Sequence, residues 1–116
     1  MSSAGAAGGP LQRGSIWWVD LDPTRGAEIR KQRPAVVLSA DGLNRIRRAV
    51  VVVPLSAGLA PRPPIIVVVS SAGKDSVAVC DQLRAVDRTR FIRLSGTLSR
   101  ADLRAVEDGV RAVLLL

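Results

Sequence analysis

The chain has 116 residues, which is enough for one domain with a single modest core. Seventeen lysines and arginines against ten acidic residues give a formal charge of +7, so we expect an anionic partner, either nucleic acid or an acidic protein. The sequence has no histidine and no tyrosine, which excludes Ser-His-Asp triads, histidine acid–base pairs and ordinary zinc sites. Cys80 is the single cysteine, and without a histidine to activate it we interpret it as a small core side chain rather than a nucleophile.

The first residues do not resemble the domain that follows. Residues 1–12 are rich in alanine, glycine and serine, and they lack the basic start and apolar stretch of a signal peptide. We interpret them as a disordered tail ahead of a single domain, residues 13–116. No apolar run approaches the roughly 18 residues of a membrane span, so the expected location is the cytoplasm.

The first expected strand is Ile16–Leu21, which has the aromatic and β-branched content of a strand. Trp17, Val19 and Leu21 then share one face, and Trp18 points to the other. Further strands are expected where apolar, largely β-branched runs recur, at Pro34–Leu38, Ala49–Pro54, Ile65–Ser70, Ser76–Arg84 and Phe91–Leu94. The short polar segment 40–45 between the second and third strands suits a turn or one helical turn.

A helix is expected at the C-terminal end. Ser99 is a suitable N-cap, and Asp102 favours the positive end of the helix. Apolar residues then recur at helical spacing, at Leu103, Val106, Val110, Val113 and Leu114. Several antiparallel strands followed by one amphipathic helix predict an α+β fold, in the form of a small barrel.

The segment between the first two expected strands is strongly basic. It contains Arg25, Arg30, Lys31 and Arg33 with a single carboxylate, Glu28. A cationic loop held by two apolar strands is how a rigid scaffold presents a site for a phosphate backbone. Arginine-rich usage throughout the chain explains part of the charge excess, but it does not explain this local concentration.

These residues also carry a family resemblance. The order G-x-I-W-x-V-D-L-D-P-T-x-G-x-E, a basic spacer and then R-P-A-V-V-L-S resembles the MazF/PemK/Kid toxins of bacterial toxin–antitoxin systems. The match continues through Asn44-Arg45, Val53–Ser56, Asp75–Val77 and Cys80–Arg84. The resemblance implies the SH3-like barrel with a C-terminal helix of the CcdB/PemK-like fold. It also implies a homodimer, and an acidic antitoxin of the MazE type whose C-terminal segment lies over the basic surface.

The activity that the resemblance implies is sequence-specific cleavage of single-stranded RNA, with mRNA as the first target. RNA carries its own nucleophile, so attack by the 2′-hydroxyl requires no metal or cofactor and leaves a 2′,3′-cyclic phosphate and a 5′-hydroxyl. The protein must then supply a base, cationic groups for the charge on phosphorus and a proton for the leaving oxygen. Without histidine, arginines, carboxylates and hydroxyls must do this.

Three residues are candidates for the chemistry. Arg33 precedes Pro34, which favours an extended conformation, and a guanidinium there can bind the scissile phosphate with two hydrogen bonds; the family's R-P arginine is catalytic. Ser56 occupies the place of a catalytic threonine of the family and keeps its hydroxyl. Glu28 either accepts the 2′-hydroxyl proton or orders the basic loop through ion pairs.

Asp81 is the alternative base. Some relatives use the aspartate of this C-D-Q motif together with an arginine two residues earlier, where this chain has Val79.

Recognition of RNA bases is expected to use hydrogen bonds to the base edges, because the chain has few aromatic residues. The candidates for RNA binding are Arg25, Arg30, Lys31, Asn44, Arg45, Asp81 and Gln82.

A second class of function stays open at this point. A toxin of the same fold that poisons DNA gyrase without cutting anything, or a plain basic barrel that binds nucleic acid, would share the composition. The R-P motif followed by a hydroxyl at Ser56 favours the endoribonuclease.

Overall fold

The computed structural model describes residues 10–21 and 32–116. Its elements are β1 (Ser15–Asp20), β2 (Gln32–Val37), α1 (Asp41–Ile46), β3 (Ala49–Ala57), β4 (Ile66–Val68), β5 (Ser76–Val79), β6 (Arg84–Asp87), β7 (Phe91–Thr97) and α2 (Arg100–Leu114). Three 3₁₀ turns join some of these elements, η1 (Ser70–Ala72), η2 (Cys80–Gln82) and η3 (Arg88–Arg90). The predicted α+β class is therefore confirmed, with the C-terminal helix and the first three strands close to the positions that the sequence pattern predicts.

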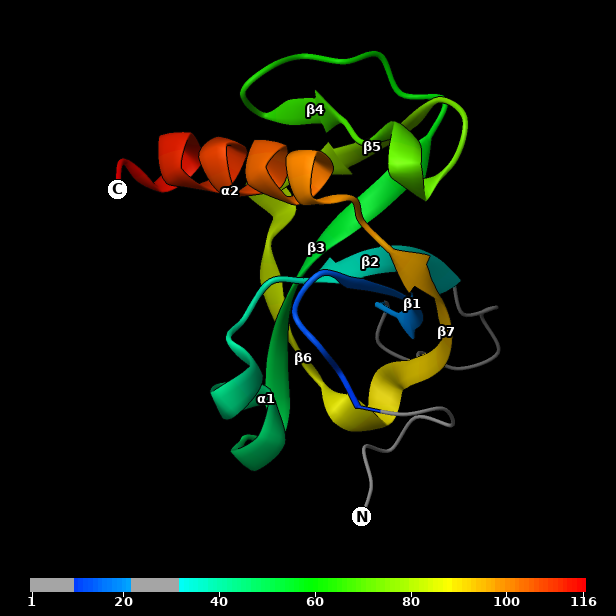
Figure 1. The fold of residues 1–116 in the computed structure, drawn as a ribbon, viewed down its shortest axis with the longest axis vertical. Helices are drawn as coiled ribbons and strands as arrows, with labels where there is room; N and C mark the ends of the chain where they lie inside the picture. Colours follow the sequence, from blue (N-terminus) through cyan, green and yellow to red (C-terminus); the bar gives the residue numbers. More distant parts are fainter. Residues whose placement is uncertain (1–9, 22–31) are drawn as a thin grey trace, which may run out of the picture.

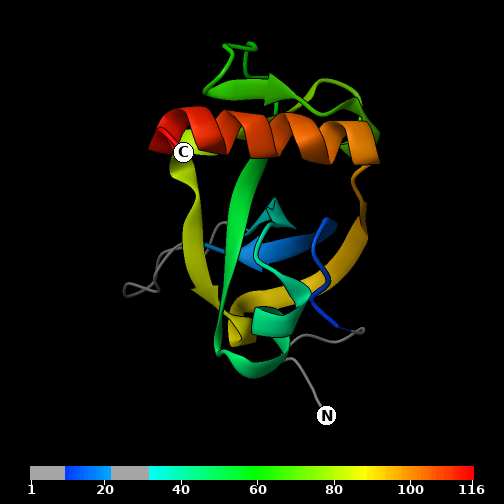
Figure 2. The ribbon, with the colours of Figure 1, turned by 60° about the vertical axis from the view of Figure 1, so that its left-hand side comes forward.

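The strands form one antiparallel sheet that curls but does not close. Its order is β4-β5-β3-β2-β1-β7, and β6 pairs with β3 outside this path. Among the described residues no ladder joins β6 to β7, so the closed barrel expected from the sequence is not confirmed. Helix α2 lies across one end of the curl, and α1 lies at the opposite end (Figures 1 and 2).

Strand β3 connects all parts of the sheet. Its first half pairs with β6, its middle with β2 and its last three residues with β5. Pro54 lies where these ladders change: it is the last residue paired with β2, and the β5 ladder begins at Leu55. Proline has no backbone N–H to donate to a ladder. Pro54 lies where β3 stops pairing with β2 and begins to pair with β5.

Alternate residues of β1, β2 and β3 face two separate cores. A sheet core inside the curl contains Leu11, Trp17, Val19, Val37, Val50, Val52, Val86 and Phe91, among others. Trp17 and Phe91 meet edge to face there, with ring centroids 6.1 Å apart. A helix core between the sheet and α2 contains Ile16, Val36, Val53, Leu55, Cys80, Val106 and Val110, among others. The predicted inward faces of Trp17, Val19 and Leu21 are confirmed, since all three side chains are buried in the sheet core.

The single strand expected at Ser76–Arg84 is wrong. The chain forms β5, then the helical turn η2, and then β6. Ala78 faces Leu55, whereas Arg84 faces Val52, so six residues of this segment cover three residues of β3. The three residues of η2 take up the difference. The expected strand at Ile65–Ser70 is likewise shorter, because only Ile66–Val68 pairs with β5.

Side chains hold the first turn and the middle of α2 in place. Ser99 is the N-cap, as predicted, and its hydroxyl accepts a hydrogen bond from the Asp102 backbone N–H at 3.1 Å. The carboxylate of Asp102 accepts a hydrogen bond from the Ser71 backbone N–H at 2.8 Å, which ties η1 to the helix. At the other side of the helix, Arg13 forms a salt bridge with Glu107 at 2.6 Å, and this joins α2 to the residues before β1.

Gly109 allows α2 to approach η2 closely. A Cβ atom at this position would lie 2.6 Å from Cys80 Sγ and 2.8 Å from the Pro64 carbonyl oxygen. Both distances are below van der Waals contact, so a larger residue would push the helix away from the sheet. Glycine weakens a helix interior by about 1 kcal/mol relative to alanine, and here the close packing against Cys80 explains its presence.

Replacing Gly109 with alanine should therefore destabilise the protein, although the same change raises the stability of an open helix. We expect Gly109→Ala to lower the free energy of unfolding by about 1–3 kcal/mol, as overpacking does elsewhere, measured by urea denaturation. Adding Cys80→Ala removes the nearer sulfur atom and should recover part of this loss. An alanine variant that is more stable than the wild type would contradict the close approach.

Candidate functional site

Arg33 and Ser56 belong to the same end of two neighbouring strands. Ala35 of β2 faces Pro54 of β3, and this is the last pair of their ladder. Arg33 and Ser56 each lie two residues beyond that pair, on the same face of their strands as Ala35 and Pro54. This is the end of the sheet where β1 finishes and β2 begins, since Val19 is the β1 partner of Arg33. The joint role of the two residues in catalysis stays a prediction.

Both side chains are accessible there. The face of β2 that carries Ala35 and Val37 is buried in the sheet core, but Arg33, two residues nearer the strand end, is exposed. Ser56 is half-buried, and β3 has by that residue turned to pair with β5, where Ser56 faces Val77. Among the described residues no carboxylate forms an ion pair with Arg33. In the described part of the chain, an exposed guanidinium and a half-buried hydroxyl therefore lie at this end of β2 and β3.

Asp81 and Gln82 lie farther along the same part of the sheet. Both are exposed on η2, which follows β5 and lies beside the middle of β3. Asp81 is four residues beyond Val77, the partner of Ser56. The fold therefore brings η2 near the candidate site but does not place Asp81 directly opposite Ser56.

Asn44 and Arg45 lie at the other end of the molecule. They belong to α1, which precedes β3, whereas Ser56 is near the end of that strand. The seven steps along the strand from Ala49 to Ser56 span about 23 Å at ~3.3 Å per residue. Arg45 is exposed, but Asn44 is only 4% exposed.

The Asn44 amide is already used within the fold. Its nitrogen donates to the carbonyl oxygens of Leu11 at 3.0 Å and of Ser39 at 2.9 Å. Its oxygen accepts from the Ser39 hydroxyl, which itself accepts from the backbone N–H of Val51. The contacts tie α1 to β3 and to the segment before β1. They give Asn44 a structural role, and a role in reading bases stays a prediction.

Four predicted site residues lie outside the described residues: Arg25, Glu28, Arg30 and Lys31. Their roles as base or phosphate ligands stay predictions. By sequence they belong to the segment that joins the end of β1 to the start of β2.

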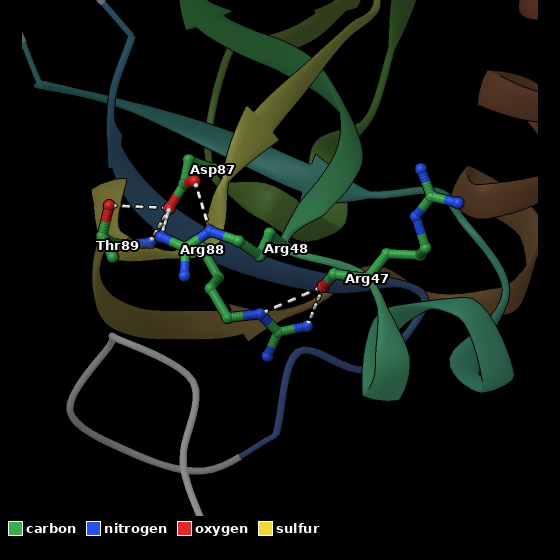
Figure 3. Close-up of polar contacts among 5 residues, drawn as sticks. All are labelled: Arg47, Arg48, Asp87, Arg88 and Thr89. Carbon is green, nitrogen blue, oxygen red and sulfur yellow. Dashed lines mark hydrogen bonds and ion pairs between the residues drawn. The ribbon is translucent and has the colours of Figure 1, made fainter.

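Several arginines near α1 have structural partners instead of free guanidinium groups. Arg88 donates to the Arg47 carbonyl oxygen at 2.6 and 3.2 Å and also to that of Asn44, so it covers the C-terminal end of α1 (Figure 3). Asp87 accepts hydrogen bonds from the Thr89 backbone and hydroxyl and pairs with Arg48 at 3.3 Å. The hydrogen bonds from Thr89 and the nearby Arg48 charge lower the pKa of Asp87. Arg47 points away from this cluster in the figure.

One surface pair was missed by sequence reasoning. Trp18, on the outer face of β1, is half-buried, and the guanidinium carbon of Arg93 on β7 lies 5.0 Å from the centre of its ring. The two residues face each other across the β1–β7 ladder, with Pro34 of β2 on the other side of Trp18. Nothing in the spacing of residues so far apart in the sequence signals this contact.

The chain was compared with known protein families and structures. The family model described as "PemK-like, MazF-like toxin of type II toxin-antitoxin system" matches residues 12–114. The chain belongs to the PemK/MazF toxin family. The endoribonuclease MazF9 of Mycobacterium tuberculosis is 37% identical over 110 residues, which cover 87% of this chain and 93% of that protein. The endoribonuclease toxin MazF of Escherichia coli K12 is 32% identical over 102 residues, covering 87% and 91%.

Solved structures of this family share the fold. Crystal structures of MazF from Deinococcus radiodurans alone and of its MazE-MazF complex superpose with TM-scores of 0.77 and 0.76. Each is 23% identical to this chain, and they cover 94% and 90% of it and 100% and 96% of the respective solved chains. At this level of identity the superposition shows the architecture only. Together with the family match, it identifies the curled sheet with its C-terminal helix as the PemK/MazF toxin fold.

The described part of this PemK/MazF chain has neither a cluster of metal ligands nor a membrane-spanning helix. Within residues 10–21 and 32–116, no group of three or more histidine, cysteine or acidic side chains is arranged to hold a metal ion. In the same part of the chain, no helix has the length and apolar character needed to cross a bilayer.

Cys80 has the environment of a core residue, as the sequence indicated. It is fully buried in the helix core, and its sulfur lies 3.9 Å from the Val106 carbonyl oxygen. Burial, followed by the neighbouring Asp81 charge, raises the pKa of the Cys80 thiol from 9.0 to about 11. The thiolate needed for nucleophilic chemistry is therefore scarce at neutral pH.

The Asn44 network can be tested by mutation. We expect Asn44→Ala to lower the free energy of unfolding by about 1–3 kcal/mol, since it leaves buried polar groups of Leu11 and Ser39 without their partner. The exposed neighbour Arg45→Ala is the control, with a change within about 0.5 kcal/mol. An Asn44→Ala protein of unchanged stability that cuts RNA at altered sequences would instead support the predicted role in base reading.

The raised pKa of Cys80 predicts an unreactive thiol. Because the pKa lies near 11, the group stays protonated through pH 8, and iodoacetamide should label the folded protein far more slowly than the protein in guanidinium chloride. Mass spectrometry at several pH values measures this. Equal labelling rates in the folded and unfolded protein would contradict both the burial and the shifted pKa.

Proposed function

We propose that this chain is the toxin of a type II toxin–antitoxin system and acts as a sequence-specific endoribonuclease on single-stranded RNA. The observation that carries the proposal is that Arg33 and Ser56 both lie just beyond the last β2–β3 pair, at an accessible end of the sheet, in a chain whose relatives are named endoribonucleases. These relatives do not favour the alternative of a gyrase poison or a plain nucleic-acid-binding barrel. We take mRNA as the first target.

The chemistry follows from these two side chains and the nucleophile within RNA. Arg33 binds two oxygens of the scissile phosphate through its planar guanidinium and stabilises the charge that develops on phosphorus. The hydroxyl of Ser56 donates a hydrogen bond to the same phosphate. The 2′-oxygen gives its proton to a carboxylate base and bonds to phosphorus, while the bond from phosphorus to the 5′-oxygen breaks and that oxygen takes a proton from solvent. The products are a 2′,3′-cyclic phosphate and a 5′-hydroxyl.

The base for the 2′-hydroxyl is a carboxylate, because arginine stays protonated. Glu28, in the basic segment before Arg33, is the first candidate, and Asp81 on η2 is the second. The nucleophile belongs to the RNA and the step uses no metal ion, so the reaction is metal-independent. Arg25, Arg30 and Lys31 contact neighbouring phosphates, and Asp81 and Gln82 contact bases. Arg45 contacts a phosphate farther along the strand, and Asn44 contacts a base only if it releases its bonds to Leu11 and Ser39.

The expected partners extend the proposal. The toxin works as a homodimer in the cytoplasm, and it is inhibited by an acidic antitoxin that covers the basic surface. The MazE-MazF complex of Deinococcus radiodurans supports this, because its MazF chain has the same architecture. We also propose that the curled sheet functions as the SH3-like barrel of the family, completed by side chains across its open seam.

The first experiment incubates the purified protein with a long single-stranded RNA in EDTA and maps the cut sites and their ends. We expect cleavage at one short motif with cyclic-phosphate ends. Arg33→Ala should lower the cleavage rate by about 10²–10³-fold, the usual cost of one donor to a developing charge. Arg100→Ala, which removes an exposed arginine from α2, is the matched control and should cut at the wild-type rate.

Variants of Ser56 test whether its hydroxyl takes part in the cleavage. Ser56→Ala should slow cleavage, and Ser56→Thr should preserve or raise the rate, because threonine retains the hydroxyl. Cleavage by Arg33→Ala at the rate of Arg100→Ala would show that the site is elsewhere. If the folded wild-type protein leaves the RNA intact, the endoribonuclease proposal is wrong, and the alternative of a toxin that poisons DNA gyrase is favoured.

A further inference from the structure

The contact between Trp18 and Arg93 has no role in the chemistry proposed above. It lies on the outer face of β1 and β7, whereas Arg33 and Ser56 share the opposite face of the sheet. Trp18 is two residues from the end of β1, and its β2 partner Pro34 directly follows Arg33. The pair is therefore close to the end of the sheet that carries the candidate site, but not part of it.

The guanidinium of Arg93 lies over the indole ring of Trp18. Its central carbon is 5.0 Å from the centre of the ring, which is within the range of a cation–π contact, and Arg93 itself is exposed. Among the described residues no carboxylate forms an ion pair with this guanidinium. The attraction to the ring keeps the guanidinium beside Trp18, and its exposed side is open to a planar ligand.

Such a surface matches one feature of single-stranded RNA. Unpaired bases stack on aromatic rings and on the planes of arginine side chains, and this contact tolerates different sequences because every base has a flat face. The positive charge attracts the adjoining phosphate at the same time. A lysine in place of Arg93 would keep the charge but lose the plane.

We propose that Arg93, held over the Trp18 ring, is a stacking platform for one base of the RNA substrate. The platform lies outside the scissile step, since it occupies the face of the sheet opposite Arg33, and it binds a flanking nucleotide as the strand passes the end of β1 and β2. This inference rests on the proposed endoribonuclease function. It adds a binding contact that raises affinity without touching the reacting atoms.

The probe is an RNA of about twenty nucleotides that contains the mapped cleavage motif, with a 2′-deoxy sugar at the cut position to prevent cleavage. The chain has two tryptophans, and Trp17 is fully buried, so a change in tryptophan fluorescence on binding reports on Trp18. We expect the wild type to show this change and Trp18→Phe to lose it while still binding the RNA.

Kinetics on the unmodified RNA give a second readout. Arg93→Lys should raise KM about five-fold or more and leave kcat unchanged, which corresponds to ~1 kcal/mol, the lower limit for one stacked base. Arg104→Lys, an exposed position on α2, should leave both constants unchanged. A change confined to KM separates a binding platform from a loss of folding, which would lower kcat as well.

The outcomes distinguish the two proposals. If wild-type protein fails to cut RNA at all, or cuts the 2′-deoxy probe, the proposed function is wrong and the platform falls with it. If the wild type cuts normally but its fluorescence is unchanged and Arg93→Lys has the wild-type KM, only the platform is wrong. An unchanged KM with a lower molecular mass of Arg93→Lys in sedimentation would show instead that a second copy of the chain covers Trp18.

Discussion

The fold depends on one strand that is buried along almost its whole length. β3 pairs with β6, β2 and β5 in succession, and its alternate residues enter two different cores. A strand in this position must be apolar on both faces, which accounts for the run of four valines from Val50 to Val53. Because β2, β5 and β6 are placed by their pairing with β3, the position of Arg33 and Ser56 at one end of neighbouring strands is also a consequence of its register.

Local pattern predicted the elements that one short stretch of sequence determines. The β-branched runs became β1, β2 and β3, and Ser99 caps α2 as expected. The failure at Ser76–Arg84 has a different origin. Alternation continues through Cys80, but the change of partner register along β3 forces three residues into η2. That constraint lies in the sheet and has no counterpart in the local sequence.

The sequence likewise predicted only part of the candidate site. Motif and residue type were sufficient to select Arg33 and Ser56, but only the β2–β3 register shows that both lie just beyond the same end of that ladder. Asn44 was selected because amides read bases, yet its burial and its bonds to Leu11 and Ser39 were invisible in the sequence. The contact of Trp18 with Arg93 joins β1 to β7, the first and last strands of the chain, so only the sheet order reveals it. Positive charge was equally ambiguous, since Arg13 and Arg88 bind groups of the protein itself.

The open seam between β6 and β7 has a consequence for motion. In the described chain these strands are joined by the short turn η3 and by side chains such as Phe91 and Leu11, and no backbone ladder crosses the gap. Opening the curl at the seam therefore breaks apolar contacts but leaves the β3 ladders intact. Local stability then decreases from β3 towards the seam, and backbone amides along the facing edges of β6 and β7 exchange hydrogen with solvent sooner than those of β3. We therefore expect the sheet to open first at the seam between β6 and β7, while β3 keeps its pairing with β2, β5 and β6.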